Sequence, residues 1–472
     1  MRICLVTPPS PFLIDERVFI SLGILKIGAV LEQAGYEVDH LDLTGVSNFQ
    51  EAALAYPHEA IFAMTATTPQ MPAAMKIRNC LRGKVILGGP HATLVHAAAR
   101  KGNERSLRSL DELLGHFDCV VAGDGEKAIF RALREYGLID ADDPKSILWE
   151  TSEDFTKSPW PARHLVDVST YHYQIDGERA LSVVGQLGCP YMCSFCGGRN
   201  SPMLRRMRLR GSDGIVNELL HLHEAYGVSG MMFLDDELNV NKQMVELMRK
   251  IKATGIPWKL RGFIKANLFT EEQAQAMYEA GFRQLLCGFE AAHDRILKNI
   301  NKKATLEDNT RVIRIAHKYG LKVKALMSIG HAGESEETIL AIRDWLIQEK
   351  PDDFDCTVIT VYPGTPYSDD AVNLGDNVYK YETNGDALYH EGVDFHQEAA
   401  YYKGRVGDYK AFVWSDHISR ERIVLLRDEV EHDVRKALNI SYPTAASAIN
   451  YDHTMGMSLP PSVLTKGVSA NG

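Results

Sequence analysis

The chain has 472 residues and a net charge of −10, with 45% hydrophobic and 24% charged residues. This composition excludes collagen, a coiled coil and global disorder, and at roughly 150 residues per domain the length predicts about three domains. An acidic balance argues against nucleic acid as a general partner, because nucleic-acid binding needs a basic surface.

The sequence shows no apolar stretch of the ~18 residues that a membrane span needs. The N-terminal apolar run is short and ends at Pro8, so it predicts a first strand and not a signal peptide. We therefore expect a cytoplasmic protein with reduced thiols, in which clustered cysteines are metal ligands or catalysts and not disulfides.

The first part of the chain alternates short apolar runs with helical patterns. Ile20, Ile24, Ile27 and Leu31 share one helix face, and Gly35 ends that helix. The pattern predicts an α/β fold that begins with a doubly wound, Rossmann-like parallel sheet over residues 1–145, with its ligand at the carboxyl ends of the strands. The strands are expected at 3–6, 37–43, 60–65, 84–87 and 119–122, and the segments at their ends, 7–10, 65–68, 88–93 and 123–126, are rich in small or turn-forming residues.

Residues 146–180 carry prolines without clear periodicity and are expected to form a linker. The alternation then resumes over 181–375 with a longer period, which predicts a partial (β/α)6 barrel of the TIM type with catalytic residues at the carboxyl ends of its strands. Thr305 is expected to cap a helix that Gly320 ends. The barrel strands are expected at 181–187, 231–234, 258–263, 284–289, 322–329 and 356–361.

Residues 376–472 are expected to form a mostly helical region that covers the barrel. One amphipathic helix there carries its apolar side chains on a single face. These are Ile423, Leu426, Val430, Val434 and Leu438.

The most informative feature is the C-x3-C-x2-C spacing of Cys189, Cys193 and Cys196, directly after the first barrel strand. A structural zinc site needs four ligands, and the sequence offers no second C-x2-C pair. A disulfide would leave an odd thiol in a reducing compartment. An iron–sulfur cluster held by three cysteines leaves one iron open to a substrate, whereas closed electron carriers use four. The other five cysteines are scattered, as small apolar residues are.

The cysteine motif resembles the signature of the radical S-adenosylmethionine (SAM) enzymes, including the aromatic Phe195 before the third cysteine. The resemblance implies a 4Fe–4S cluster on Cys189, Cys193 and Cys196, whose fourth iron binds SAM. The reduced cluster then cleaves SAM to a 5′-deoxyadenosyl radical that abstracts a hydrogen atom from the substrate. Segments 289–290, 293–298 with Lys302, 330–334 and 362–366 also resemble the family, although 331–332 departs from the commoner Leu-Pro. The implied SAM-binding residues are Phe195, Glu290, Gly330, Gly333 and Glu334.

We expect Asp235, Asp236, Arg261 and Glu290 to face the barrel mouth, with salt bridges or helix caps as the alternative roles. The basic run at 205–210 is expected to be a loop that faces solvent or the cosubstrate. Nucleic-acid binding is the alternative there, but the run lacks interleaved aromatic residues.

The N-terminal sheet resembles the cobalamin (B12)-binding domain of one radical SAM subfamily, on the segments 7–9, 22–24, 88–93 and 123–126. The D-x-H-x-x-G motif, whose histidine ligates cobalt in other B12 proteins, is absent, and His91 does not stand in that context. A cobalamin here would have another lower ligand or none, and the alternative is that the domain is only a scaffold. The implied cobalamin contacts are Thr7, Pro8, Thr65, Thr67, Thr68, Gly88, Gly89, His91, Thr93, Gly123, Gly125 and Glu126.

Together these features predict a cobalamin-dependent radical SAM methyltransferase that acts on an unactivated carbon of a small-molecule or natural-product substrate. Its reductant would be of the flavodoxin or ferredoxin type. The alternatives are a radical dehydration, epimerisation, cyclisation or rearrangement, and a non-enzymatic iron–sulfur or zinc protein that senses or carries electrons. No motif identifies the substrate or a catalytic side chain.

Overall fold

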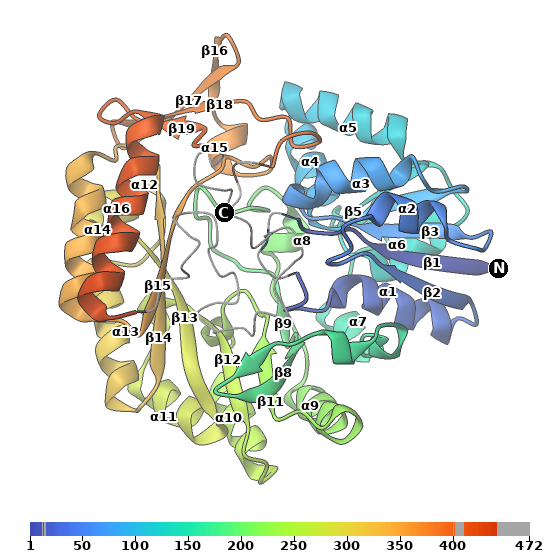
Figure 1. The fold of residues 1–472 in the computed structure, drawn as a ribbon, viewed down its shortest axis with the longest axis horizontal. Coiled ribbons are helices and arrows are strands. Elements are labelled where there is room, and N and C mark those ends of the chain that lie inside the picture. Colours follow the sequence, from blue (N-terminus) through green and yellow to red (C-terminus); the bar gives the residue numbers. More distant parts are fainter. Residues whose placement is uncertain (12, 14–15, 400, 402–409, 441–472) are drawn as a thin grey trace.

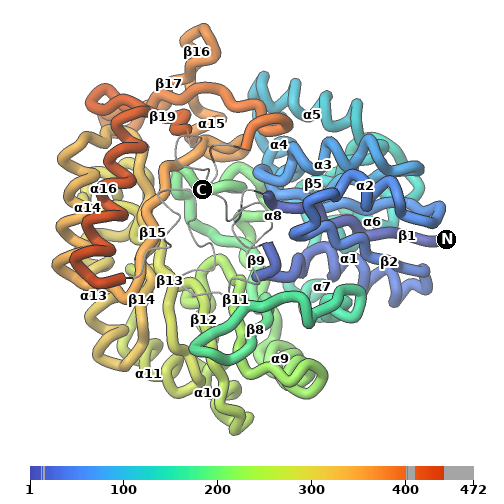
Figure 2. Tube along the Cα trace, in the orientation of Figure 1, coloured from blue at the N-terminus to red at the C-terminus, as the bar shows by residue number. Residues whose placement is uncertain are grey.

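The computed structural model describes residues 1–440 apart from 12, 14–15, 400 and 402–409. Residues 441–472, which include the end of the predicted C-terminal region, lie outside the described part. Figure 1 shows an N-terminal α/β domain beside a larger, curled α/β domain, and Figure 2 follows the same path as a tube.

The N-terminal domain is one parallel sheet with strand order β2-β1-β3-β4-β5-β6. The order reverses between β1 and β3, so the carboxyl ends of the strands flank a switch point where ligands bind in such sheets. Every predicted strand of this sheet is present, and its first and last residues lie within three positions of the prediction. The edge strand β6 was not predicted. The strands are β1 (Arg2–Thr7), β2 (Glu37–Asp42), β3 (Ile61–Thr65), β4 (Val85–Gly88), β5 (Cys119–Ala122) and β6 (Gly137–Asp140).

Helices cover both faces of this sheet because alternate strand residues are apolar on each side. Ile3 and Leu5 of β1 pack toward α1 and α6, whereas Cys4 and Val6 pack toward α3, α4 and α5. The helices are α1 (Leu22–Gln33), α2 (Phe49–Leu54), α3 (Met71–Arg78), α4 (Pro90–Arg100), α5 (Glu104–His116) and α6 (Gly125–Ala132).

The second domain is a curled sheet of seven strands, β15-β14-β13-β12-β11-β8-β7, in which six neighbouring strands are parallel. Only β7 (Gln174–Ile175) is antiparallel, and it pairs with the first residues of β8. The two edge strands, β15 and β7, do not pair with each other, so the sheet stays open. The predicted partial (β/α)6 barrel is therefore confirmed. Its parallel strands are β8 (Glu178–Val183), β11 (Gly230–Phe233), β12 (Lys259–Ile264), β13 (Phe282–Glu290), β14 (Lys322–Ile329) and β15 (Asp353–Val358).

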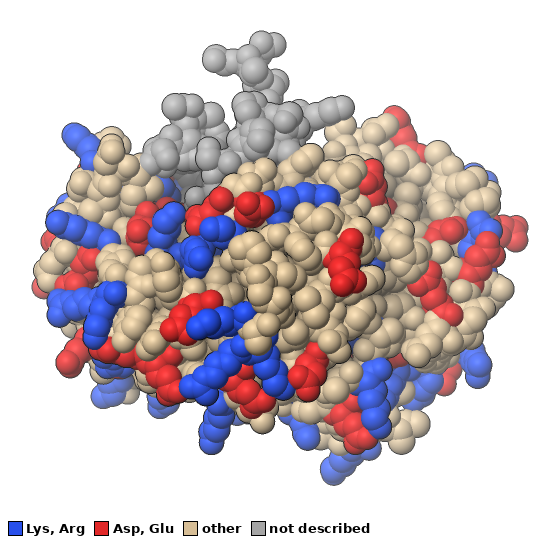
Figure 3. All heavy atoms as spheres, turned by 90° about the horizontal axis from the view of Figure 1, so that it is seen from below, with Lys and Arg blue, Asp and Glu red and all other residues tan. Residues whose placement is uncertain are grey.

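Helices line the convex side of the barrel sheet (Figure 1). The capping box of Thr305 with Asp308 begins α13, and Gly320 follows its end, as predicted. Acidic and basic side chains mix on the face seen in Figure 3, and no single-sign patch stands out there. Ion pairs such as Lys252–Glu279 join neighbouring helices. The helices are α9 (Ser212–Tyr226), α10 (Met244–Ala253), α11 (Glu271–Ala280), α12 (Asp294–Asn299), α13 (Leu306–Lys318) and α14 (Glu336–Glu349).

The C-terminal region contains the predicted amphipathic helix as α16 (Arg420–Leu438), which packs on α14 and β15. It also contains a four-stranded antiparallel sheet that the sequence analysis did not foresee. The sheet lies over the barrel mouth beside the short helix α15 (Pro366–Asp369) (Figure 1). Its strands are β16 (Val372–Gly375), β17 (Val378–Thr383), β18 (Asp386–Glu391) and β19 (Val413–Trp414).

Arg261 is placed differently from its prediction. It is the third residue of β12, not the last, and it is fully buried in the barrel interior with its Nη1 donating to the Tyr173 hydroxyl at 3.2 Å. Its side chain therefore lies below the mouth that we expected it to face. No described helix combines the length and the apolar character needed to cross a lipid bilayer.

Candidate functional site

The three clustered cysteines lie on one loop that follows β9 (Gln186–Leu187) at the carboxyl end of the first barrel strand. All three are free thiols, and Cys193 is buried. Among the described residues, no group of three or more His, Cys, Asp and Glu side chains is arranged to hold a single metal ion. A four-iron cluster takes each thiolate on a different iron, so the donor set suits a cluster better than one zinc ion.

Hydrogen bonds from two other segments fix the cysteine loop. Ser194 N–H donates to the carbonyl of Ile300 at 2.9 Å, and Asn301 Nδ2 donates to that of Met192 at 2.8 Å. Tyr367 N–H donates to the Ser194 carbonyl at 3.1 Å. The segment after α12 and the start of α15 therefore hold the loop over the mouth of the barrel.

Arg199 lies under the cysteine loop. Its Nη1 donates to the carbonyls of Cys189 at 2.7 Å and Tyr191 at 3.0 Å. Burial raises the pKa of the Cys196 thiol to about 12, and the positive charge of Arg199 opposes this rise. A thiol in this position needs further positive charge to ionise, which is what the irons of a cluster supply.

Glu290 stands at the carboxyl end of β13 in a left-handed backbone conformation, with φ of +66°. Its carboxylate accepts from Lys302 Nζ at 2.9 Å and from Ser328 Oγ at 2.8 Å. Ser328 Oγ also lies 2.8 Å from His331 Nε2, and the His331 ring packs edge-on against Phe195 with 5.2 Å between centroids. This chain of polar groups connects the acidic end of β13 with the cysteine loop.

Ion pairing and burial fix the protonation states of the groups that connect β13 with the cysteine loop. Burial alone would raise the pKa of Glu290, but the charge and hydrogen bond of Lys302, with the Ser328 hydrogen bond, bring it below its usual value. Burial would lower the pKa of Lys302, but Glu290 and other acidic groups hold it well above its usual value. Burial lowers the pKa of His331 to about 4. At neutral pH the site therefore contains a carboxylate, an ammonium and a neutral imidazole.

The segment 330–334 packs against the C-terminal sheet. Gly333 N–H donates to the carbonyl of Ala387 at 3.1 Å, and a Cβ on Gly330 would lie 2.6 Å from Val413. The Glu334 carboxylate accepts from the N–H groups of Gly330 and, at 2.9 Å, His331, so it folds back on its own turn. The contact of these residues with SAM stays a prediction.

Glu334 gives a pH prediction. Burial raises its pKa to about 7, so folding favours the protonated form, and the free energy of unfolding should fall as pH rises from about 4.5 to 7. Glu334→Gln imitates the protonated acid and should remove up to about 3 kcal/mol of this pH dependence. Urea unfolding of both proteins from pH 5 to 8 measures the difference. Parallel curves for the two proteins would show that folding does not raise the pKa of Glu334.

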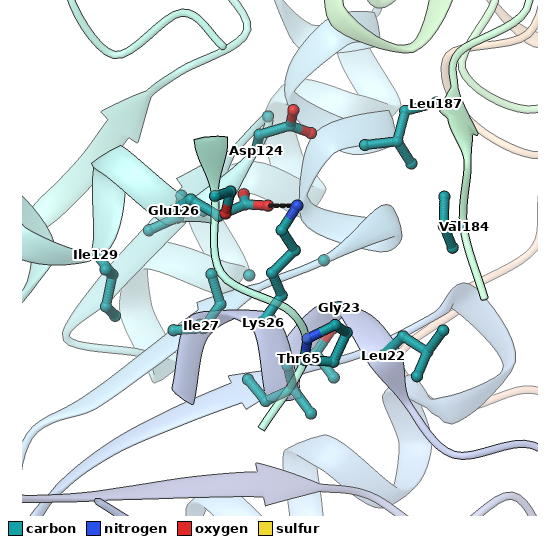
Figure 4. Close-up of a pocket in the computed structure, with 18 of the residues that line it drawn as sticks. Leu22, Gly23, Lys26, Ile27, Thr65, Asp124, Glu126, Ile129, Val184 and Leu187 are labelled. Carbon is teal, nitrogen blue, oxygen red and sulfur yellow. Dashed lines mark ion pairs between the residues drawn. The ribbon is translucent and has the colours of Figure 1, made fainter. Parts of the chain in front are cut away.

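A cavity of about 330 Å³ lies between the N-terminal sheet and the barrel. The carboxyl ends of β3, β4 and β5 form one side, α1 forms a second, and the linker at 155–161 and the barrel residues Val184 and Leu187 close it. Figure 4 shows Lys26 of α1 reaching Glu126 of α6 across it, with 3.7 Å between Nζ and Oε1. Burial lowers the pKa of Lys26, and Glu126 opposes this.

This cavity brings together most of the residues predicted to contact cobalamin. Those that line it are Thr65, Gly88, Gly89, Thr93, Gly123, Gly125 and Glu126. Five others lie outside its lining, with partners of their own. Thr7 Oγ1 lies 2.9 Å from His40 Nε2, and Thr68 Oγ1 lies 3.1 Å from Nδ1 of the buried His91. Gln70 bonds the Pro8 carbonyl and the Thr67 backbone.

The basic run and the acidic pair after β11 are mostly engaged within the protein. Arg208 is buried and pairs with Asp124 of the N-terminal domain, and Arg210 pairs with Glu218. Asp235 accepts from Gly185 N–H at 2.7 Å, and burial raises its pKa to about 7. Arg208 and Arg210 therefore join structural elements and do not form the surface that a nucleic acid would need.

Residues 183–346 match the Radical SAM superfamily. The matched segment contains the cysteine loop, Glu290 and the strands that carry them. This segment is a radical SAM domain. The prediction of a radical SAM enzyme on a partial barrel is thus confirmed.

Relatives of this radical SAM chain include an uncharacterized methyltransferase of Pyrococcus horikoshii, 27% identical over 77% of this chain and 82% of that protein. The anaerobic magnesium-protoporphyrin IX monomethyl ester cyclase of Cereibacter sphaeroides is 25% identical over 65% of this chain and 52% of its own length. The radical SAM methyltransferase TsrM of Kitasatospora setae, solved with cobalamin and a 4Fe–4S cluster bound, superposes with a TM-score of 0.59 at 18% identity. That match covers 82% of this chain and 81% of TsrM. At this identity the likeness shows a shared fold over both domains.

Sequence reasoning missed several residues of this candidate site. Ser328 and Arg199 carry no motif of their own, because their role depends on strands and loops that meet only in the fold. The linker residues Trp160 and Pro161 line the cavity, although we assigned them to a passive connection. The proline density at 158–161 was a usable signal, since a rigid segment can serve as a wall.

Proposed function

We propose that this radical SAM enzyme is a cobalamin-dependent methyltransferase that acts on an unactivated carbon of a small molecule. The observation that carries the proposal is the cavity of about 330 Å³ between the strand ends of the N-terminal sheet and the barrel. Its position is that expected for a ligand of a doubly wound sheet, and its second wall belongs to the domain with the cysteine loop.

The donor set suits a cluster and SAM. Cys189, Cys193 and Cys196 would hold the 4Fe–4S cluster, and Glu290 would accept a hydrogen bond from an ammonium or hydroxyl group of SAM. When bound, the cluster and SAM supply a 5′-deoxyadenosyl radical, and cobalamin supplies the methyl group. The protein would orient these groups relative to one another and exclude water from the space between its two domains.

The cavity suits one part of a corrinoid. Its volume lies at the lower end of the range for drug-sized ligands, so the remainder of the molecule would lie between the domains. The strand-end glycines allow the close turns that form its rim, since a Cβ on Gly89 would lie 2.4 Å from Thr65 Oγ1. The lining of this cavity does not indicate a cobalt-ligating histidine, because His91 is not part of it.

Filling the cavity should prevent corrinoid binding. Gly23 of α1 lines the cavity, and a Cβ there meets nothing within 4 Å, so Gly23→Leu should fold and occupy the space. We expect it to weaken hydroxocobalamin binding about tenfold or more, as measured by the visible spectrum of the full chain after reconstitution and desalting.

Gly115→Leu is the matched control. Gly115 is also a helical glycine with open space around its Cβ, but it lies in α5, away from this cavity. It should bind corrinoid as the wild type does. Equal corrinoid binding by Gly23→Leu and the wild type would show that cobalamin does not bind in this cavity. If the wild type binds no corrinoid, methyl transfer from cobalt is overturned.

A radical reaction without methyl transfer is the second candidate, because one relative is named a cyclase. SAM labelled with deuterium in its methyl group separates the two, since only a methyltransferase moves the label into its product. A flavodoxin- or ferredoxin-type reductant is part of either proposal, and so is a cytoplasmic location.

A further inference from the structure

A second cavity, of about 280 Å³, lies between α5 of the N-terminal domain and the C-terminal region. Figure 1 shows α5 on the same side of the molecule as α15 and the β16–β18 sheet. The cavity is built from one helix face, the end of the barrel sheet and the segment 392–396, so three parts of the chain meet around it. It shares no lining residue with the cavity of Figure 4.

Two arginines, Arg105 and Arg108, line this cavity from positions one helical turn apart on α5. Within the described part of the chain, no carboxylate lies within ion-pair distance of either guanidinium. Burial lowers the pKa of Arg105, and the charge of Arg108 adds to this, while Tyr379 and the more distant Asp369 oppose it. A pair of cations without a carboxylate partner in a concave site attracts an anion.

The Arg105 guanidinium is held in place by packing. It stacks on the Tyr379 ring at 3.9 Å, and its Nη2 donates to Ser368 Oγ at 3.4 Å. Its Nε is buried and has no hydrogen-bond acceptor among the described residues. A buried donor without an acceptor costs free energy, which a bound anion would recover.

The remaining polar groups of the lining suit an anionic ligand. Ser106 and Ser109 belong to α5, and Asn377 lies at the turn before β17. The two acidic residues of the lining are turned toward His396. Asp394 accepts from its backbone N–H at 3.0 Å, and Glu112 lies 3.0 Å from its Nδ1. Neither carboxylate lies within ion-pair distance of Arg105 or Arg108 among the described residues.

We propose that this cavity binds the carboxylate or phosphate group of a small molecule through Arg105 and Arg108. An anion held there would connect the N-terminal domain with the C-terminal sheet, since Arg105 comes from α5 and its packing partner Tyr379 from β17. The site is separate from the proposed SAM and cobalamin sites, so it does not depend on the proposed function.

Titration calorimetry of the full chain with inorganic phosphate and with succinate, at low ionic strength, tests the proposal. We expect one saturable site per chain in the wild type. Arg108→Gln should weaken it about tenfold, and Arg105→Gln at least as much, because each removes a charged hydrogen-bond donor. Arg108 is exposed, so its variant is expected to fold even if the Arg105 variant does not.

Arg82→Gln is the matched control, because Arg82 is an exposed arginine of the same domain outside the cavity lining. It should bind the anion as the wild type does. Tighter binding of phosphate than of succinate identifies a phosphoryl ligand, and the reverse identifies a carboxylate. No saturable binding of either probe, or equal binding by the wild type and Arg108→Gln, would overturn the proposal. None of these measurements involves SAM or cobalamin.

Discussion

Replacing Cys193 with alanine should abolish iron binding and SAM cleavage. Cys193 is the middle residue of the cysteine motif and is buried at the barrel mouth, so no neighbouring thiol can take its place. Because the cluster carries the electron that cleaves SAM, formation of 5′-deoxyadenosine should fall about a thousandfold or more. Iron analysis and chromatography of the reaction, both under anaerobic conditions, measure the two losses.

Cys80→Ala is the control for this prediction. Cys80 is also buried, but it packs in the N-terminal core away from the barrel. Its variant should keep the iron content and the SAM cleavage of the wild type. If Cys193→Ala retains iron and cleaves SAM at the normal rate, the proposed cluster ligands are wrong.

Glu290→Gln should weaken SAM binding at least about tenfold while the iron content stays unchanged. The substitution keeps the shape of the side chain but removes the charge that Lys302 neutralises. Leaving the buried Lys302 ammonium unpaired should also lower the free energy of unfolding by about 3 to 5 kcal/mol. Anaerobic calorimetry with SAM and denaturant unfolding measure the two effects.

The double variant Glu290→Gln/Lys302→Met separates these two effects. It removes both charges, so it should recover much of the lost stability, but it should not recover SAM binding. A double variant that binds SAM as tightly as the wild type would show that Glu290 supports the fold and does not bind SAM.

Several parallel strands could be predicted closely because they are buried on both faces and read as short apolar runs, as β4 and β5 do. The predicted strand at 322–329 agrees with β14 residue for residue. The last barrel strand was placed three residues too late, since β15 begins with Asp353 and carries Asp355, both acidic. These two acids pair with the buried Lys324 of β14, a contact that single-sequence periodicity does not reveal.

The C-terminal sheet was missed although its turn was readable. Asn384 and Gly385 both have positive φ, of 51° and 84°, as a two-residue hairpin turn between β17 and β18 requires. An Asn-Gly pair is the strongest short hairpin signal.

The candidate site could be predicted where a motif names the residue, as for the cysteines and Glu290. It could not be predicted where the role comes from tertiary contact. Ser328 lies between Glu290 and His331 only because β13 and β14 are neighbouring strands. The arginine pair of α5 looks like an ordinary exposed helix face until the segment 392–396 lies against it.

The linker that closes the larger cavity has a consequence for the assembly of the enzyme. Ala162 N–H donates to the carbonyl of Leu25 at 3.0 Å, and Lys26 lies over the Phe155 ring at 4.2 Å, so the linker is fastened to the helix that it faces. A bulky ligand that enters past residues 155–162 would first have to break these two contacts. The rate of loading should then be limited by how fast this segment opens. It should level off as the ligand concentration rises, instead of increasing in proportion to it.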